Sequence, residues 1–525
     1  MTAKCIMVLG TTSGAGKSWL TTALCRYYAR QGLKVAPFKA QNMSNNARVV
    51  ASENGQGEIG SAQYFQALAA NTVPDVRMNP LLLKPERDTH SQVVLMGQVN
   101  AELSAMPWRG RSLKVWPQIA AALDALRAEN DVVVIEGAGS PAEINLSSSD
   151  IVNMRVAKHC GAACLLVTDI DRGGAFAHLY GTWALLPEDE RTLIQGFVLN
   201  RFRGDAALLA PAPQMLQDLT GIPTVATLPM WWQHGLPEED GVFDDRSVAK
   251  DAVNMTVAVV AYPRISNLDE FQPLKNIPGV RLQWVRSPSE LAGLQPTDWI
   301  ILPGSKHTSG DLAWLRSQGL DAAIARHAGQ GGAVLGVCGG LQMLGEALID
   351  PHGIDGNAPG LGLLPLVTVF DQDKTVRHTT TRFGAGIADG ASGPQAGGLM
   401  VPNAHKSPPD SAPTDAGRGV GVPSPWSALA GVSVAGYEIH HGQTAQHPAM
   451  AKAGDVARAV LPDGLGWCNA QGNVLGVYLH GMLEDAAVLQ ALFGASTPTL
   501  ETVFEGLADY LDQHMSSDVF NDLIA

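Results

Sequence analysis

The segment AVLGVCGGLQMLG (residues 333–345) is the most informative stretch of the chain. Apolar residues lead into Cys338, two glycines follow, and the apolar residues after them can form a helix. This order is typical of a strand, a sharp turn and a helix with a nucleophile at the turn, where glycines permit strained backbone angles. A helix N-terminus favours a thiolate, and the N–H of Gly339 would point at the oxygen of a carbonyl that Cys338 attacks. The alternative is a buried structural cysteine.

The residues GVCGGLQ (336–342) resemble the nucleophile motif of class I glutamine amidotransferases. The resemblance implies that Cys338 attacks the side-chain amide of glutamine, forms a thioester and releases ammonia. Gln342 matches the glutamine of the motif, which lies beside the substrate. Gly304, which follows the expected strand 298–302, matches the small residue that supplies the second oxyanion donor.

A thiolate needs a base, and His480 is the candidate because it follows the short apolar strand 474–479. Catalytic partners of this kind lie close in space rather than in sequence. The amidotransferase family usually has an acid two residues after the histidine, where this chain has Met482. We therefore expect a Cys–His dyad, a feature of the cobalamin-type subfamily, although Glu484 could reach the imidazole.

The composition limits the classes of protein to consider. The chain has 525 residues, too many for one core, so we expect two or three domains. The formal net charge of −14 argues against nucleic acid or an anionic membrane as the main partner. No apolar run approaches the roughly 18 residues that cross a bilayer, and the first residues lack a signal-peptide pattern. The six cysteines are scattered, as free thiols in a reducing cytoplasm would be. We expect a cytoplasmic protein, and a homo-oligomer stays open.

The N-terminal segment predicts a phosphate-binding loop. An apolar strand (4–9) precedes GTTSGAGKS (10–18) and an amphipathic segment (19–30). Backbone N–H groups and the helix N-terminus of such a unit surround an anion. The expected nucleotide-binding residues of this loop are Gly14, Gly16, Lys17 and Ser18. Lys17 adds a charge on the outer phosphates, and the Ser18 hydroxyl can ligate Mg²⁺. The loop is longer than the standard spacing and resembles that of dethiobiotin synthetase and its relatives, which phosphorylate a carboxylate or carbamate.

Polar residues also end other strands of the first half, where the ligands of open α/β sheets gather. Lys39 follows the expected strand 34–38 and would face the phosphates or a carboxylate substrate; a solvated lysine is the alternative. Glu136 ends the expected strand 131–135 and is a candidate Mg²⁺ ligand, with an ordinary strand terminator as the alternative. Glu58, at the start of an expected helix (58–70), could also supply a carboxylate to the metal, or it could simply favour the helix N-terminus.

The remaining candidates in this half are weaker. Asn200 lies where relatives of this ATPase contact the adenine base. The possible substrate-binding residues are Asn42, Asp150, Asp171 and Arg172. Arg172 suits a carboxylate but is equally plausible in a surface ion pair.

Five stretches of the first half resemble the cobyric acid synthase family, which is cobalamin-type and glutamine-hydrolysing. They are PFKAQNMSNN (37–46), NPLLLKP (79–85), EGAGSPAEINL (136–146), DIDRGGAF (169–176) and LNRFRGD (199–205). The resemblance implies that ATP and Mg²⁺ activate the b, d, e and g carboxylates of adenosylcobyrinic acid a,c-diamide, and that ammonia from L-glutamine converts them to amides. The alternatives are a cobyrinic acid a,c-diamide synthase and a partitioning-type ATPase switch.

We therefore expect two α/β domains and a helical C-terminal segment. A P-loop parallel-sheet domain of the dethiobiotin-synthetase kind should occupy 1–235, with a linker at 236–252. A class I glutamine amidotransferase domain should follow at 253–490, with a flexible insertion at about 384–430. An amphipathic helical segment should form 491–525, with its apolar face packed on the body of the protein.

Overall fold

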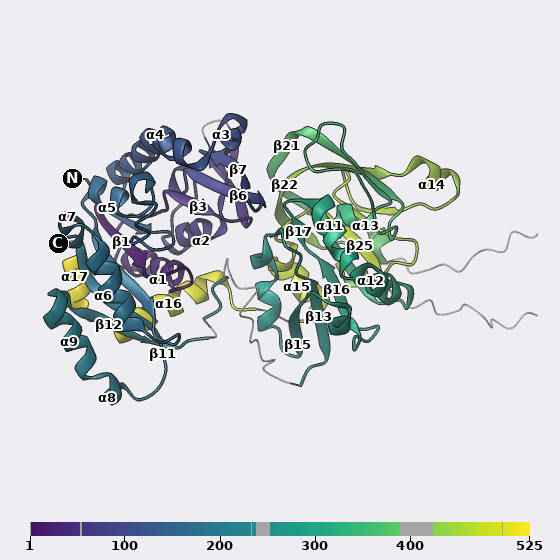
Figure 1. Ribbon diagram of the computed structural model, residues 1–525. Helices are drawn as coiled ribbons and strands as arrows, with labels where there is room; N and C mark the ends of the chain where they lie inside the picture. Colours follow the sequence, from purple (N-terminus) through teal and green to yellow (C-terminus); the bar gives the residue numbers. More distant parts are fainter. Residues whose placement is uncertain (1, 53–54, 233, 238–251, 389–423, 496) are drawn as a thin grey trace, which may run out of the picture.

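The chain folds as two α/β units that lie side by side (Figure 1). The computed structural model describes residues 2–52, 55–232, 234–237, 252–388, 424–495 and 497–525. Among these residues, no helix has the length and apolar character needed to cross a membrane. The expected pair of parallel-sheet α/β folds is confirmed.

Six parallel strands form the sheet of the first unit, in the order β12-β11-β10-β1-β9-β2. They are β1 (Lys4–Gly10), β2 (Val35–Phe38), β9 (Val132–Glu136), β10 (Ala163–Asp169), β11 (Ile194–Phe202) and β12 (Thr224–Pro229). Their interiors are mostly apolar because helices cover both faces of a parallel sheet. The loop between β1 and α1 (Lys17–Arg30) therefore lies at the carboxyl edge of the sheet, beside the ends of β9 and β10.

The C-terminal helices return to this first unit. Helices α16 (Leu500–His514) and α17 (Ser517–Leu523) lie among its elements, drawn in yellow beside the purple α1 (Figure 1). The Phe520 ring stacks on Tyr27 with 3.8 Å between the ring centroids. The hydroxyl of Tyr28 donates a hydrogen bond to the Phe520 carbonyl (2.8 Å). The predicted C-terminal amphipathic helix thus packs on the unit farthest from it in sequence.

Seven strands form the sheet of the second unit, in the order β15-β13-β16-β18-β25-β24-β23. They are β13 (Met255–Val260), β15 (Val280–Val285), β16 (Trp299–Leu302), β18 (Ala333–Val337), β23 (Arg458–Leu461), β24 (Gly466–Cys468) and β25 (Val474–Val477). The first five strands in this order run parallel, and β24 and β23 pair antiparallel at one edge. Strands β18 and β25 are neighbours, so the residues after each strand meet at one edge of the sheet.

The first unit also has six short strands: β3 (Gln41–Met43), β4 (Ala47–Ser52), β5 (Gly55–Gly60), β6 (Leu81–Arg87), β7 (His90–Leu95) and β8 (Gln98–Val99). Contacts from β4, β5, β6 and β7 reach the second unit. The facing strands of the second unit are β21 (Leu366–Arg382) and β22 (Ser433–Gln446). The backbone N–H of His378 donates to Gln56 Oε1 (2.9 Å), and the His378 ring lies 2.8 Å from the Val49 carbonyl oxygen. The β4–β5 hairpin therefore docks directly on β21.

The helix expected at 58–70 begins later than the sequence indicated. Glu58 lies in β5, and helix α2 (Ser61–Ala69) follows it. The reason is the pair of glycines around Glu58, which are poor helix formers. Gly57 also packs so closely that a Cβ there would lie 2.9 Å from the Cα of Gly97, a contact that only a glycine in a strand permits.

Two expected irregular segments fall partly outside the described residues. The predicted linker at 236–252 includes 238–251, and the predicted insertion at 384–430 includes 389–423; both of these ranges are outside the description. The described ends of the insertion belong to the core of the second unit. Trp426 is fully buried, and its ring centroid lies 4.6 Å from that of Trp299.

The turn after β18 requires glycine at its second position. Helix α13 (Gly339–Leu344) begins there and lies against β16. A Cβ on Gly340 would lie 1.9 Å from the carbonyl oxygen of Leu302, far inside van der Waals contact. The two glycines therefore let the helix approach the neighbouring strand closely enough to hold the turn in place.

We expect Gly340→Ala to lower the stability of the second unit by about 1–3 kcal/mol, because the added methyl group must push α13 away from β16. Thermal unfolding followed by tryptophan fluorescence measures the change. Gly329→Ala is the matched control, since Gly329 ends helix α12 (Leu320–Gly329) and a Cβ there meets nothing within 4 Å. Equal melting temperatures for the two variants would contradict this explanation of the turn.

Candidate functional site

Cys338 occupies a strained turn at the end of β18. Its backbone has φ 51° and ψ −105°, values that a residue with a side chain rarely adopts. The residue is buried, with 5% of its surface exposed, and its Sγ lies 3.7 Å from the carbonyl oxygen of Ile439 on β22. Strain of this kind persists only where the surrounding structure imposes it, and it clusters at reactive sites. The thiol is therefore held at a defined position before helix α13.

His480 lies next to this thiol, as the sequence predicted. The two side chains line the same pocket. The backbone N–H of His480 donates to the Tyr437 carbonyl (2.9 Å), and the Tyr437 N–H donates to the His480 carbonyl (3.1 Å). The two rings also stack, with 5.4 Å between their centroids. Tyr437 thus holds His480 both through its backbone and through its ring.

Glu270 completes the group as an acid that the sequence did not reveal. Its Oε1 lies 3.0 Å from His480 Nδ1, and its Oε2 accepts a hydrogen bond from the Gly481 N–H (2.9 Å). Glu270 comes from the 3-10 helix η3 (Leu268–Asn276), which follows β13. The expectation of a Cys–His dyad is therefore corrected to a Cys–His–Glu arrangement in which the carboxylate orients the base.

The acid does not lie two residues after the histidine, where this chain has Met482. It comes instead from the segment that follows β13. Glu270 precedes His480 by 210 residues, so no local spacing connects the two. The nearby candidate, Glu484, pairs instead with Arg48 of the first unit, at 2.6 Å. The only sequence signal was the acidic pair Asp269-Glu270 after an apolar strand, which is common at strand ends.

The charges around His480 favour its protonated form. Burial alone lowers the pKa of the imidazole, but the charges of Glu270 and of the Cys338 thiolate outweigh it and raise the pKa of His480 to about 10. At neutral pH the imidazole beside the Cys338 sulfur is therefore protonated. A protonated imidazole next to a cysteine is the arrangement that cysteine nucleophiles use to attack a carbonyl group.

Gly304 and Gly339 lie around this centre and leave no room for side chains. A Cβ on Gly304 would lie 2.9 Å from His480 Cε1. A Cβ on Gly339 would lie 2.7 Å from the backbone nitrogen of Ser305. The structure therefore brings together the two residues that the sequence assigned to the oxyanion site. Their role as donors stays a prediction.

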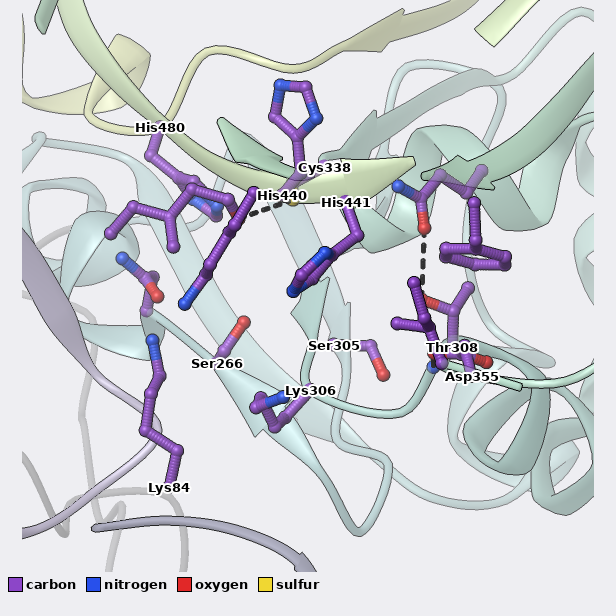
Figure 2. A pocket seen from close by; sticks show the side chains of 16 residues that line it. Lys84, Ser266, Ser305, Lys306, Thr308, Cys338, Asp355, His440, His441 and His480 are labelled. Atoms are coloured by element: carbon purple, nitrogen blue, oxygen red, sulfur yellow. Dashed lines mark hydrogen bonds between the residues drawn. The ribbon is translucent and has the colours of Figure 1, made fainter. Parts of the chain in front are cut away.

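A pocket opens in front of the thiol (Figure 2). Its lining combines polar residues of the second unit with one lysine of the first: Lys84, Ser266, Asn267, Ser305, Lys306, Thr308, Cys338, Gln342, Ile354, Asp355, Phe370, Lys374, Ile439, His440, His441 and His480. Gln342, the predicted substrate neighbour, accepts a hydrogen bond from Thr308 Oγ1 at 3.0 Å. The pocket has both polar and apolar lining residues and adjoins the reactive sulfur, as a site for glutamine must.

The glycine-rich loop of the first unit has the features of a phosphate cradle. Gly14 and Gly16 have φ values of 71° and 102°, which side chains disfavour. Lys17 Nζ donates to the carbonyl oxygens of Thr12 (3.0 Å) and Gly139 (3.2 Å), so it bridges this loop and the one after β9. The residues predicted from the motif thus lie together at the N-terminus of α1.

Glu136 is the charged centre of this edge. It is 1% exposed, and its Oε1 accepts hydrogen bonds from Ser18 Oγ and Lys39 Nζ, both at 2.8 Å. Gln66 Nε2 donates to the other oxygen at 2.5 Å. Burial alone raises the pKa of Glu136, but Lys39 and the hydrogen-bond donors outweigh it and lower the pKa. A hydroxyl and an ionised carboxylate side by side are ligands that Mg²⁺ accepts.

Glu58 does not belong to this group. Lys84 Nζ donates to its Oε2 at 2.7 Å, and Lys374 of the second unit forms an ion pair with its Oε1. Both oxygens are thus engaged by lysines at the interface between the units. This corrects the expectation that Glu58 could serve the metal: with β5 in place of a helix, its side chain faces β6 and β21.

Asn200 and Asn42 make contacts inside the first unit. Asn200 Nδ2 donates to the Ala15 carbonyl (3.0 Å) and lies against the phosphate loop. Asn42, on β3, donates to Gln63 Oε1 (3.3 Å) and is 4% exposed. A contact of Asn200 with adenine and of Asn42 with a substrate stay predictions.

The other proposed substrate residues have structural partners. Asp150 Oδ1 accepts the backbone N–H groups of Val152 (2.9 Å) and Asn153 (3.1 Å), which orders the entry to helix α5 (Met154–Cys160). A separate cluster of charged residues joins the ends of β10 and β11. In it Arg172 Nε lies 3.3 Å from Asp169 Oδ2, and Asp171 pairs with Arg203 Nε at 2.8 Å.

These contacts give Asp150 a structural role and agree with the ion-pair alternative for Arg172. A contact of Asp150, Asp171 or Arg172 with a substrate stays a prediction. Among the described residues, no group of three or more His, Cys, Asp or Glu side chains forms a metal site. Any metal at Ser18 and Glu136 would therefore need further ligands from phosphate oxygens and water.

Comparison with known proteins assigns both units. The description "CobQ/CobB/MinD/ParA nucleotide binding domain" matches residues 6–235, and "CobB/CobQ-like glutamine amidotransferase domain" matches residues 256–488. Proteins named cobyric acid synthase are similar over the whole length. Those from Polaromonas naphthalenivorans (strain CJ2) and Albidiferax ferrireducens (strain T118) are 74% identical, and that from Variovorax paradoxus (strain S110) is 73% identical, with 100% of both chains covered in each case. The chain therefore belongs to the cobyric acid synthase family.

Proposed function

We propose that this chain uses ATP and L-glutamine to amidate the b, d, e and g carboxylates of adenosylcobyrinic acid a,c-diamide, which yields adenosylcobyric acid in cobalamin biosynthesis. The chain is a glutamine-dependent amide ligase by family. The observation that carries the proposal is the coexistence of a Cys–His–Glu site and a phosphate loop in one chain. One unit can release ammonia, and the other can activate a carboxylate.

The glutaminase step follows from the contacts of Cys338. The thiolate attacks the side-chain amide carbon of glutamine, and the N–H groups near Gly339 and Gly304 are placed to stabilise the oxyanion. His480 gives its proton to the leaving nitrogen, so ammonia departs and a thioester remains. Water, deprotonated by His480, then releases glutamate and restores the thiolate. Glu270 keeps the imidazole oriented through both proton transfers.

The ligase step follows from the chemistry of carboxylates. A carboxylate does not exchange oxygen for ammonia in water, because the oxide is a poor leaving group. Transfer of the γ-phosphoryl group of ATP to the carboxylate gives a mixed anhydride, and ammonia then displaces phosphate. Lys17, in the first turn of α1, would hold the outer phosphates of ATP during transfer of the γ-phosphoryl group. Ser18 and Glu136 would hold Mg²⁺, which supplies charge neutralisation at the phosphates.

Lys39 gives this edge of the sheet a further function. Its ammonium lies 2.8 Å from Glu136 Oε1 and is buried, so it holds the carboxylate ionised without a metal. When a cation approaches the same oxygen, Lys39 can turn to a phosphate or to the substrate carboxylate. We assign it the role of neutralising charge during phosphoryl transfer.

The domain assignment forms part of the proposal. The ligase unit comprises 1–235 together with helices α16 and α17, which pack on it. The start of the expected segment 491–525 belongs instead to the glutaminase unit, because Phe493 packs on Trp299. The glutaminase unit comprises 253–490. We place the protein in the cytoplasm, where ATP and glutamine are available.

The test of the function is product analysis with two corrinoids. We expect glutamine-dependent ATP hydrolysis only with adenosylcobyrinic acid a,c-diamide, and four added amides by mass spectrometry. Turnover with cobyrinic acid instead, giving two amides, would indicate the a,c-diamide synthase reaction. ATP hydrolysis that needs neither corrinoid nor glutamine would indicate a partitioning-type switch.

We expect two variants to separate the half-reactions. Cys338→Ser should lose glutamine-dependent amidation by about 10³-fold or more, because the alkoxide is a poor substitute for the thiolate, yet it should keep activity with ammonium salts. Lys17→Met should lose amidation with both nitrogen sources and keep glutamate release from glutamine. Loss of ammonium-dependent activity in Cys338→Ser would contradict the separation of the two sites.

The role of Glu270 predicts a change in pH dependence. Glu270 raises the pKa of His480, so the imidazolium persists up to about pH 10. In Glu270→Gln the pKa of His480 should fall, and the alkaline limb of glutamate release should move to lower pH. We expect the maximal rate to drop by about 10²-fold.

The matched control is Glu438→Gln, which removes the carboxylate 3.2 Å from His440 in the same unit. This variant should leave the alkaline limb where it is. An unmoved limb in Glu270→Gln would show that the carboxylate does not act on His480.

A further inference from the structure

Residues 46–48 of the first unit contact the loop that carries Glu270. Asn46 Oδ1 accepts a hydrogen bond from the backbone N–H of Leu268 (3.0 Å). The carbonyl oxygen of Ala47 accepts one from Asn267 Nδ2 (2.8 Å). These two contacts hold the start of η3, only two residues before the acid of the glutaminase site.

Arg48 extends this contact to the loop that carries His480. Its Nη1 and Nη2 donate to the two carboxylate oxygens of Glu484 at 2.7 and 2.6 Å. Nη2 also pairs with Asp269, next to Glu270 in sequence. Glu484 belongs to η6 (Met482–Glu484), which begins two residues after His480. One buried guanidinium from the ligase unit thus joins the two loops that supply the acid and the base.

Tyr437 closes the same assembly. Its hydroxyl lies 2.6 Å from Asn267 Nδ2, and its ring lies under the guanidinium of Arg48 at 5.2 Å. The Tyr437 ring also stacks on the imidazole of His480. A displacement of Arg48 would therefore shift the imidazole of His480 by two routes, through η6 and through the Tyr437 ring.

The segment that ends at Arg48 begins at the nucleotide site. Lys39 pairs with Glu136 at 2.8 Å, and Asn42 contacts Gln63 at 3.3 Å. Nine residues after Lys39, the same stretch of chain reaches the glutaminase loops. The backbone from Lys39 to Arg48 therefore connects the phosphate edge directly to the contacts of residues 46–48.

We propose that Arg48 is a positioning residue for the glutaminase reaction: the ligase unit, through residues 46–48, sets the alignment of Glu270 and His480 with Cys338. The inference rests on the proposed function. Bidentate pairing of a guanidinium with a carboxylate fixes both groups in direction as well as distance. Without Arg48, the carboxylates of Asp269 and Glu484 would be left beside Glu270 with no compensating charge.

The test compares glutamate release with ammonium-dependent amidation in full-length Arg48→Gln. We expect kcat for glutamate release to fall about 10–100-fold, because a small misalignment of catalytic groups has effects of this size, while KM for glutamine stays within about threefold. Ammonium-dependent amidation should stay within about twofold of the unmodified protein. Arg48→Lys should recover only part of the rate, since an ammonium cannot pair with both oxygens in the fork geometry.

Arg264→Gln is the matched control. Arg264 also joins the two units, through an ion pair with Asp88 at 2.6 Å, but Asp88 is 95% exposed and Arg264 does not line the pocket. This variant should release glutamate at the normal rate. A loss equal to that of Arg48→Gln would mean that docking of the units in general, and not Arg48, controls the site.

Two further outcomes would overturn the inference. Unchanged glutamate release in Arg48→Gln would show that the alignment does not need Arg48, and equal losses of glutamine- and ammonium-dependent activity would indicate general damage to the fold. If Arg48→Gln does not fold, Glu484→Gln tests the same contact from the other side, and an unchanged kcat there would also reject it. Failure of the unmodified protein to act on a corrinoid would reject the proposed function alone, because glutamate release is measured without one.

Discussion

The buried contact between Glu270 and His480 is the interaction on which the glutaminase site depends. A charged imidazole in a dry environment is costly unless a carboxylate lies against it. Glu270 meets this need from one side, and its second oxygen is fixed by the Gly481 N–H. The strained turn at Cys338 then places the sulfur beside the imidazolium of His480, whose position Glu270 fixes. Every other feature of the pocket, including the close approach of Gly304 to the imidazole, presupposes this pair.

The ligase unit also stabilises a buried charged group, but with a lysine in place of a histidine. Glu136 is as buried as Glu270, and it is held ionised by Lys39 and by the donors of Ser18 and Gln66. In both units the carboxylate stands at the carboxyl edge of a parallel sheet, where the strand ends bring residues distant in sequence together. The difference lies in the partner. A histidine that must cycle its proton stays with its carboxylate, whereas a lysine can leave when phosphates and a metal arrive.

The sequence predicted those parts of the protein that follow from local chemistry. The phosphate loop, the cysteine turn and Glu136 each combine an apolar strand with glycines and one polar residue, so a short window suffices to recognise them. Glu270 and Arg48 have no such window, because each acts on a residue more than 200 positions away. The prediction for Glu58 was wrong for a different reason, because a local pattern was present but was misinterpreted. The place of Glu58 before an apolar segment indicated a helix and a metal, but the nearby glycines disfavour a helix, and the pairing of β5 with β4 places the carboxylate at the interface.

The path of the chain explains how the two units stay docked through polar contacts. The contacts between the units include buried ion pairs, such as Arg48 with Glu484 and Lys374 with Glu58, beside the apolar packing of Ile439 on the first unit. Interfaces of this kind bind weakly between separate molecules. Here the chain leaves the first unit before 252 and returns to it at α16, so two covalent crossings keep the partners at a high effective concentration. Individually modest contacts are then sufficient for docking, and among them the buried fork of Arg48 on Glu484 fixes direction as well as distance. An interface of apolar contacts alone would hold the units together, but it would not fix the direction of any group next to the glutaminase site.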